Sequence, residues 1–297
     1  MTSNTADMPA QEDGDARCST LPFNPKNPID LSTFSFCKEL CEGGFGEVVL
    51  ASHPVTEELV AVKIMAKKQR KKEKVYKELE IMKIATGCRY LMSLRAFAET
   101  PDDYLIGMDY MVRGDLFNHM THWMPFNIQT TSDLKPENIL IDDNGHIKIS
   151  DFGLSAINVF QGVILKNFVG SKGYMAPEVM DGQGYNHLAD SFSLGVILYI
   201  MAVGHQPFYS RGSLEEYRQS LEEDVPHYAL GICFDAVDLI DGLLCKNPFF
   251  RYAITSYFRT HPFFSSISWS ESIRLITISP MQVPSMKEAL RYDMKII

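Results

Sequence analysis

The sequence lacks the features that mark several protein classes. Its six cysteines contain no Cys-x-x-Cys pair, which favours free thiols in a reducing compartment over a disulfide framework or a zinc site. The longest apolar run, Leu194–Val203, is too short to span a bilayer, and no N-terminal apolar segment resembles a signal peptide. An excess of positive charge is also absent, because 37 Asp and Glu residues outnumber 28 Lys and Arg residues and the formal net charge is −9. We therefore expect a cytoplasmic protein, with the nucleus as an alternative, that has no transmembrane segment and no nucleic-acid partner.

The pattern of apolar residues changes along the chain. Residues 1–32 are rich in small and polar residues without periodicity, and we predict that they are disordered. The next third carries short apolar runs and one helical stretch. The predicted strands are Phe34–Leu40, Val48–Ser52, Leu59–Met65, Met92–Ala98 and Tyr104–Tyr110, and the predicted helix is Glu73–Ala85.

The pattern after Gly114 is different. A hairpin is predicted across the turn Asp142-Asp143-Asn144-Gly145. The elements predicted here are the strands Ile139–Ile141 and Ile147–Ile149 and the helices Leu188–Val203, Leu214–Glu223 and Phe234–Cys245. A β-rich small lobe followed by a helical large lobe indicates a cleft between two lobes.

The first motif is a glycine-rich run between two predicted strands, Leu40-Cys41-Glu42-Gly43-Gly44-Phe45-Gly46-Glu47-Val48. Glycines allow backbone N–H groups to approach phosphate oxygens closely. The run lies in a strand–turn–strand context, whereas the dinucleotide-binding fingerprint continues into a helix. Taken alone, the run is explained equally well as an ordinary tight turn.

The second motif is a lysine at the end of an apolar strand, Val60-Ala61-Val62-Lys63. Such a lysine points into either solvent or a cleft. Glu78 follows fifteen residues later in the predicted helix. A pair between Lys63 and Glu78 would hold the lysine over nucleotide phosphates.

The third motif carries the most information. Asp133-Leu134-Lys135-Pro136-Glu137-Asn138 is followed, after the hairpin, by Asp151-Phe152-Gly153. Phosphoryl transfer needs a carboxylate that orients the hydroxyl, a cation for the transferred phosphate and oxygen ligands for Mg²⁺. Asp133, Lys135, Asn138 and Asp151 supply these groups in that order.

The fourth motif, Gly170-Ser171-Lys172-Gly173-Tyr174-Met175-Ala176-Pro177-Glu178, closes a segment that begins at Asp151 and has the length of an activation loop. Arg251 is a candidate partner for Glu178. With these motifs the chain resembles protein serine/threonine kinases of the AGC group from about Phe34 to Phe264. Val169–Glu178 and Ala189–Gly195 are most similar to G-protein-coupled receptor kinases, and ribosomal S6 kinase-like proteins are nearly as close.

The resemblance implies an α+β, two-lobed fold with ATP and Mg²⁺ between the lobes. The kinase domain would span residues 33–264, with a small lobe over 33–111 and a large lobe over 112–264. Residues 265–297 would be a truncated C-terminal extension of the AGC type. The implied activity is transfer of the ATP γ-phosphate to Ser or Thr hydroxyls of protein substrates.

The resemblance also implies a role for each site residue. Asp133 orients the hydroxyl, Lys135 stabilises the transferred phosphate, and Asn138 and Asp151 hold Mg²⁺. Met108 is the gatekeeper next to the adenine hinge, Asp109–Met111, and Asp115 contacts the ribose. The remaining nucleotide contacts are the loop residues Leu40, Gly43, Gly44 and Gly46, the adenine-sandwiching Val48, Ala61 and Leu140, and the pair Lys63 and Glu78.

The chain departs from the family at several single positions. Cys41 stands where the first glycine of the loop is expected, and its side chain would crowd the approach to phosphate. Ser132 replaces the arginine that grips a phosphorylated activation loop, and Thr131 replaces the preceding His or Tyr. Asn167 occupies the position of the phosphorylated Thr. We therefore predict regulation without phosphorylation of this loop.

The largest departure from the family is the length of one segment. Asp115 and Asp133 lie 18 residues apart, about half the spacing in the family, so part of the large lobe is missing. We expect one side of the apolar helix Leu194–Val203 to meet water or only loosely packed residues such as Phe126 and Ile128. An alternative function is therefore a pseudokinase or scaffold that keeps the kinase shape with little catalysis. The protein substrate and the oligomeric state do not follow from the sequence.

Overall fold

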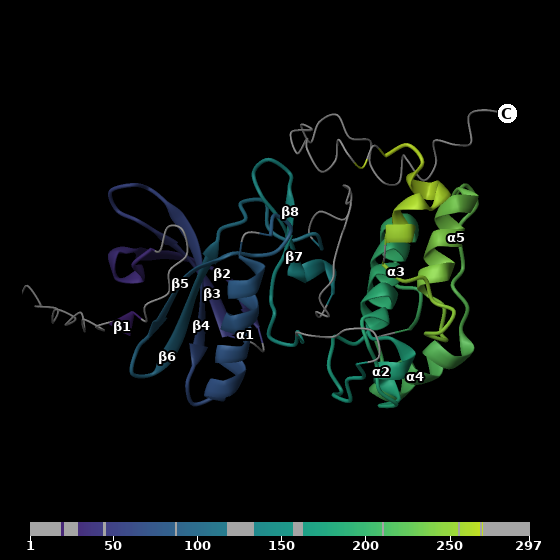
Figure 1. The fold of residues 1–297 in the computed structure, drawn as a ribbon, viewed down its shortest axis with the longest axis horizontal. Coiled ribbons are helices and arrows are strands. Elements are labelled where there is room, and N and C mark those ends of the chain that lie inside the picture. The colour runs from purple at the N-terminus through teal and green to yellow at the C-terminus, as the bar shows by residue number, and fades with distance from the viewer. Residues whose placement is uncertain are drawn as a thin grey trace, which may run out of the picture. The chain divides into compact units, whose positions relative to one another are not determined.

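The fold is an antiparallel sheet followed by a mainly helical part (Figure 1). The computed structural model describes residues 19–20, 29–43, 46–86, 88–117, 134–156, 163–209, 211–254, 256–267 and 269. The strands are β1 (Ser19–Thr20), β2 (Ser35–Gly43), β3 (Gly46–Ser52), β4 (Leu59–Ala66), β5 (Leu94–Glu99), β6 (Asp103–Asp109), β7 (Ile139–Ile141) and β8 (Ile147–Ile149). The α-helices are α1 (Lys72–Ala85), α2 (Pro177–Met180), α3 (Leu188–Val203), α4 (Leu214–Glu223) and α5 (Phe234–Leu243). Short 3₁₀ helices are Leu31–Thr33, Pro136–Asn138, Ser256–Thr260 and Pro262–Phe264.

The chain divides into two compact units. The first contains the described residues within 1–71 and 95–108, and the second contains the described residues within 72–94 and 109–297. Helix α1 is thus grouped with the second unit, whereas the sequence assigned it to a small lobe over residues 33–111.

The first unit is built on a six-stranded sheet with the strand order β1-β5-β6-β4-β3-β2. Strand β3 pairs antiparallel with β2 and with β4, and Val49 lies opposite Val62. These β-branched side chains are buried together with Val60 and Leu105, because alternate residues of a strand point to the same face. One face of the sheet therefore forms the small core of this unit.

Helix α1 buries a regular stripe of side chains. Val75, Leu79 and Met82 follow one another at spacings of four and three residues, and all three are buried. This spacing places them on one face of an α-helix. Glu78 is buried on the same helix.

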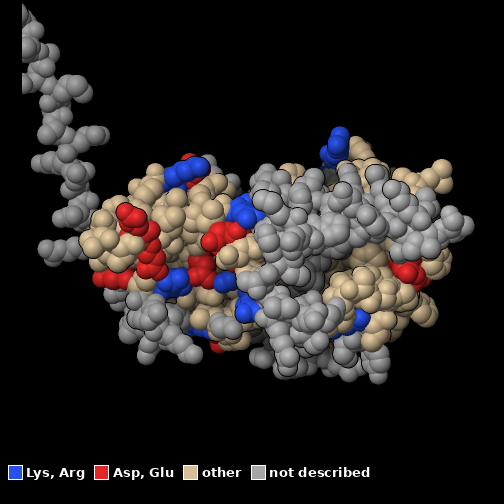
Figure 2. Space-filling model, turned by 90° about the horizontal axis from the view of Figure 1, so that it is seen from above, with Lys and Arg blue, Asp and Glu red and all other residues tan. Residues whose placement is uncertain are grey.

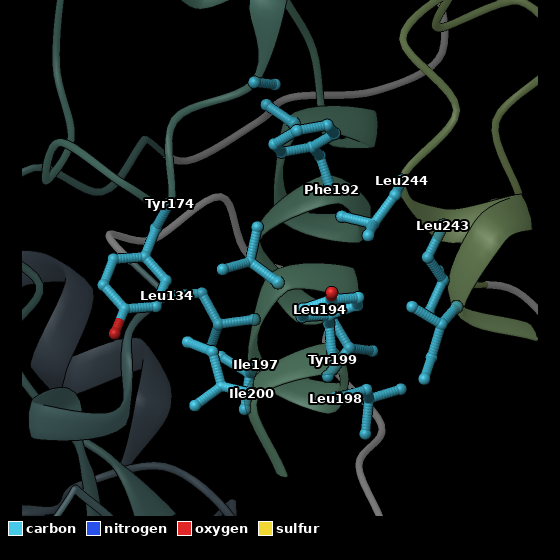
Figure 3. Close-up of a cluster of buried hydrophobic side chains, with 14 of the residues drawn as sticks. Leu134, Tyr174, Phe192, Leu194, Ile197, Leu198, Tyr199, Ile200, Leu243 and Leu244 are labelled. Carbon is cyan, nitrogen blue, oxygen red and sulfur yellow. The ribbon is translucent and has the colours of Figure 1, made fainter. Parts of the chain in front are cut away.

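Helix α3 forms the centre of the second unit. Its residues Ala189–Met201 are all buried, and α5 packs against it. The backbones approach closely at Gly195, where an added Cβ would lie 2.9 Å from the Cβ of Leu243. Figure 3 shows Leu243 and Leu244 on one side of α3, with Leu134 and Tyr174 on the other.

The burial of α3 corrects one expectation from the sequence. We expected one side of this helix to meet water or loosely packed residues, but Leu194, Ile197 and Met201 are each at most 2% exposed. Side chains from several separate segments surround it, including Leu134, Tyr174, Tyr217 and Leu243. Phe126 and Ile128 lie outside the described residues. Exposure of α3 to water is therefore wrong as a prediction.

Most predicted elements are confirmed within one to three residues at each end. Helix α3 has exactly the bounds predicted for it, Leu188–Val203, while α5 ends at Leu243 instead of Cys245. Within residues 1–32, two described parts have regular structure, and the prediction of disorder for this segment stays a prediction. Ser19–Thr20 pairs with β5, and Leu31–Thr33 is a 3₁₀ helix capped by Asp30.

On the face shown in Figure 2, the described Lys and Arg side chains lie in several small groups among acidic and uncharged residues. Among the described residues, no helix is both long enough and apolar enough to cross a membrane.

Candidate active site

The glycine-rich hairpin is formed by β2 and β3. Gly43 ends β2 and lies opposite Gly46, the first residue of β3. Gly46 has a φ of 125°, and an added Cβ would clash with the carbonyl oxygen of Ile64. Only glycine fits this position without strain. Leu40 lies half-buried in β2, and Gly44 lies outside the described residues.

The strand register brings three predicted site residues to one face of the sheet. Val48 lies directly opposite Lys63 in β4, and Ala61 lies two residues before Lys63. Directly opposite residues of an antiparallel pair share a face, as do residues two apart on one strand. The other face carries Val49 and Val62, which belong to the core. Hence Val48, Ala61 and Lys63 lie together on the face away from that core.

Cys41 belongs to the same row of the sheet. It is the partner of Val48 in β2, after a register shift between Glu39 and Cys41. Its side chain is exposed. Cys41 is therefore a strand residue on the same face as Lys63. From the sequence, Cys41 was placed at the first glycine position of the loop.

Lys63 and Glu78 are both buried, with 6% and 7% of their surfaces exposed. Burial of a charged residue is costly unless its charge is compensated. The two residues belong to different compact units, and their pairing stays a prediction.

The predicted hinge follows the end of β6. Met108 is buried within β6, and Asp109 forms a 2.6 Å ion pair with Lys148 of β8. Sequence reasoning missed Lys148, because nothing in the order of residues links it to the hinge. Met111 is buried and accepts a 3.0 Å hydrogen bond from the N–H of Gly114, whose φ is 75°.

Asp115 and Leu140 lie opposite each other in a short antiparallel bridge. The bridge is extended by hydrogen bonds from Leu116 N–H to the Ile139 carbonyl at 2.7 Å and from Ile141 N–H to the Gly114 carbonyl at 2.8 Å. The predicted ribose contact and one predicted adenine contact are thus brought together.

The hairpin of β7 and β8 brings both predicted magnesium ligands to one end. Asn138 precedes β7 and Asp151 follows β8 after Ser150, while Ile139 pairs with Ile149. The Asn138 carbonyl accepts hydrogen bonds from the N–H and hydroxyl of Ser150 at 2.8 and 3.1 Å. The two side chains offer an amide oxygen and a carboxylate, which are ligands that Mg²⁺ prefers. These residues fit the expected metal.

Asp151 has a left-handed backbone conformation, with a φ of 60°. Such a conformation costs about 1–3 kcal/mol in a residue other than glycine and occurs often at functional sites. The Asp151 carboxylate accepts a 3.3 Å hydrogen bond from the N–H of Gly153. Phe152 between them is only 1% exposed and fixes the turn in the core.

Lys135 donates a 3.0 Å hydrogen bond from Nζ to Oγ of Ser171. This contact links the predicted catalytic run, residues 133–138, to the predicted activation segment. Sequence reasoning missed this contact. Asp133, the predicted catalytic carboxylate, lies outside the described residues together with Ser132 and Thr131.

The predicted pair of Glu178 and Arg251 is confirmed. The guanidinium donates two hydrogen bonds to the carboxylate, at 2.6 and 2.9 Å, and both side chains are buried. Arg251 also donates to the carbonyls of Leu188 and Cys245, and its guanidinium lies 5.1 Å from the centre of the Phe192 ring. This network fixes α2 to the start of α3.

Two further contacts hold the predicted activation segment. Leu165 and Tyr185 exchange backbone hydrogen bonds of 2.7 and 2.8 Å. The Tyr217 hydroxyl donates a 2.9 Å hydrogen bond to the Met175 carbonyl. Burial raises the pKa of this phenol, so it stays protonated as a donor. The segment is therefore attached both to the chain before α3 and to α4.

Comparison with known proteins agrees with this geometry. The protein kinase domain family matches residues 34–132 and 130–264. The two matches meet within the short segment between Asp115 and Asp133.

Three curated relatives show the same relationship. The RAC serine/threonine-protein kinase of Drosophila melanogaster is 32% identical over 82% of this chain and 44% of its own length. Protein kinase C delta type of Rattus norvegicus is 30% identical over 90% of this chain and 43% of its length. Serine/threonine-protein kinase Sgk1 of Rattus norvegicus is 34% identical over 85% of this chain and 67% of its length.

The chain spans about four tenths of the length of the first two relatives. These comparisons do not decide between the receptor-kinase-like and S6-kinase-like subgroups that the activation segment resembles. The motifs, the two-part fold and the relatives agree on the larger grouping. The chain belongs to the protein kinase family, within its AGC group of serine/threonine kinases.

Proposed function

We propose that this chain is an active protein serine/threonine kinase that transfers the γ-phosphate of ATP to Ser or Thr hydroxyls of proteins. The observation that carries the proposal is the cluster at the end of the β7–β8 hairpin. There the predicted metal ligands Asn138 and Asp151 lie on either side of the paired strands β7 and β8, and Lys135 donates a hydrogen bond to Ser171.

Each residue has a distinct task in the proposed reaction. Gly46 permits close approach of backbone to phosphate, and Lys63 contacts the α- and β-phosphates. Asn138 and Asp151 would hold Mg²⁺, which neutralises charge on the phosphates when bound. Asp133 orients the attacking hydroxyl, and Lys135 stabilises negative charge on the transferred group. Positioning and electrostatics supply the rate, as is usual in phosphoryl transfer.

The test is transfer of labelled phosphate from Mg-ATP to a generic Ser/Thr protein substrate. Asp133→Asn removes the charge at constant shape, and we expect the rate to fall by about a hundredfold or more. Asp143→Asn is the matched control, because Asp143 is exposed in the hairpin turn. Equal rates for Asp133→Asn and Asp143→Asn would refute an active kinase that uses Asp133.

The second candidate function is a pseudokinase or scaffold. It is favoured by the division of the family match into two parts, which overlap at residues 130–132, and by Ser132 in place of the expected arginine. A chain of this kind binds Mg-ATP or a protein partner without transferring phosphate. Nucleotide binding by a folded sample that transfers no phosphate would therefore favour the scaffold.

The location and the regulation belong to the same proposal. The cytoplasm, with the nucleus as an alternative, rests on the pattern of cysteines in the sequence. Regulation without activation-loop phosphorylation rests on Asn167 and Ser132. Phosphatase treatment is expected to leave the rate unchanged, and a large loss mapped to Ser155 or Ser171 would contradict this part.

A further inference from the structure

Helix α5 has two faces of different character. One face is buried in the core around α3, and its side chains are Ala236, Leu239, Ile240 and Leu243. Phe234, Asp238 and Asp241 follow one another at spacings of four and three residues, which places them on the opposite face. All three are exposed. The outer face of α5 therefore carries one aromatic ring and two carboxylates.

The loop before α5 is held beside the helix. Residues 224–233 connect α4 to α5. The Tyr228 hydroxyl donates a 2.5 Å hydrogen bond to the Asp241 carboxylate, and Nζ of Lys246 donates one of 2.7 Å to the Asp224 carbonyl. The Tyr228 ring also packs edge-on against Tyr199 of α3, with 5.4 Å between the ring centres. The loop thus runs along α5 in the opposite direction and is fixed to the core.

Two large apolar side chains are exposed where this loop enters the helix. Leu230 is fully exposed, and Phe234, four residues later, is 80% exposed. Ile232 between them is partly buried against the core, so the backbone here is attached to the core. A single exposed apolar side chain is ordinary, but two large ones on one fixed junction form a small apolar surface of the kind that proteins use for binding.

The chain around this junction is acidic. Residues 219–245 contain no Lys or Arg, and their acidic residues are Glu222, Glu223, Asp224, Asp235, Asp238 and Asp241. Asp235 is half-buried and the other five are exposed.

Two groups that can carry positive charge touch this acidic stretch. Lys246 donates to the Asp224 carbonyl, and Nε2 of His261 lies 2.9 Å from Oδ2 of Asp238. Six carboxylates exceed these two groups, so the surface remains negative. Leu230, Phe234 and the six acidic residues are together called the α5 surface. None of them is among the residues predicted to contact ATP or Mg²⁺.

We propose that the α5 surface binds a basic amphipathic helix of a partner protein. The apolar side chains of such a helix would cover Leu230 and Phe234, while its Lys and Arg side chains would lie among the carboxylates. The same carboxylates repel an anionic membrane and nucleic acid. Two copies of the α5 surface repel each other for the same reason, so charge selects a cationic partner.

The probe is a synthetic helical peptide of about 16 residues that has leucines along one face and lysines on the other. Fluorescence anisotropy of the labelled peptide measures its binding to the full chain, without nucleotide. We expect a Kd of about 1–100 μM at low salt. A peptide with Glu in place of every Lys, and a peptide of the same composition in an order that forms no apolar face, should each bind at least about tenfold more weakly.

Two variants place the probe on the α5 surface. The double variant Leu230→Ser with Phe234→Ser should weaken the peptide about tenfold or more and leave the melting temperature unchanged, because both side chains are exposed. Asp238→Lys should weaken it by a similar factor through charge reversal one turn from Phe234. Val55→Ser and Glu80→Lys, at exposed positions outside the α5 surface, are the matched controls and should leave the affinity unchanged.

The peptide series needs no variant, so the proposal stays testable if a variant does not fold. Absence of binding up to about 1 mM protein, or equal affinity for the Glu peptide or for the reordered peptide, would overturn it. Full affinity in the folded Leu230 and Phe234 double variant would overturn it as well. Because binding is measured without ATP or substrate, failure here is distinguishable from failure of the proposed kinase activity.

Discussion

Lys135 and Ser171 are 36 residues apart in sequence, yet Nζ of the lysine donates a 3.0 Å hydrogen bond to Oγ of the serine. The bond joins the predicted catalytic run to the segment that ends at Glu178. It fixes a flexible cationic side chain, and a lysine that is held in place would cost less to order during the proposed phosphoryl transfer.

Ser171→Ala is expected to lower kcat about tenfold and to change the KM for ATP little, because the contact orients Lys135 without touching the nucleotide. Ser171→Thr keeps the hydroxyl and should restore most of the rate. Steady-state kinetics on the three proteins provide the check. A rise in KM at constant kcat would show that Ser171 serves binding and not the chemical step.

Lys63→Ala is expected to weaken binding of Mg-ATP, because Lys63 lies buried on the sheet face that also carries Val48 and Ala61. Saturation at about 100 times Kd stabilises the native chain by roughly 2.7 kcal/mol, which a melting experiment detects. Lys68→Ala, at an exposed position beyond the strand, should leave this shift intact. If Mg-ATP gives no shift in a folded native sample, the nucleotide site itself is refuted.

Cys41→Gly is expected to tighten nucleotide binding, since the backbone can then approach phosphate more closely. The same change costs about 0.5–1 kcal/mol of stability, because Cys41 lies in β2 opposite Val48. Calorimetric affinity and a melting curve separate the two effects. Loss of stability with no gain in affinity would mean that Cys41 serves only as a strand residue.

Glu178→Gln is expected to destabilise the fold by about 3–5 kcal/mol, because it leaves the buried guanidinium of Arg251 without its anion. Arg251→Lys should also be costly, since an ammonium cannot form the two parallel hydrogen bonds. Urea unfolding measures both variants. A loss below about 1 kcal/mol would place the pair among weak surface ion pairs, contrary to its burial.

Ser191 and Ser193 form a matched pair on helix α3. The Ser193 hydroxyl donates a 2.9 Å hydrogen bond to the Tyr174 carbonyl, whereas that of Ser191 is fully buried and has no partner among the described residues. Ser191→Ala should therefore stabilise the fold by about 1 kcal/mol, and Ser193→Ala should destabilise it by a similar amount. Thermal unfolding measures whether the two substitutions shift the melting temperature in opposite directions. Equal shifts of the melting temperature for both variants would contradict these expectations.

The sequence by itself determined the strands, the long helices and the motifs with which the site is built. Hydrophobic periodicity is local, so Leu188–Val203 was predicted with its observed bounds, and the Asp-Phe-Gly turn was found without any structure. The pairing of Glu178 with Arg251 was also predicted from the sequence, where Arg251 was named as a candidate partner of the glutamate that ends the fourth motif.

Only the tertiary structure decided which side chains meet across long separations. The pair of Asp109 with Lys148 and the bond from Lys135 to Ser171 depend on strand register and on packing around α3. The burial of α3 was likewise decided only by the tertiary structure. A sequence shows that a helix is apolar on every side, but it does not show which other segments cover that helix. The packing of the whole unit decides this, because dispersion and burial act between atoms that are distant in the chain.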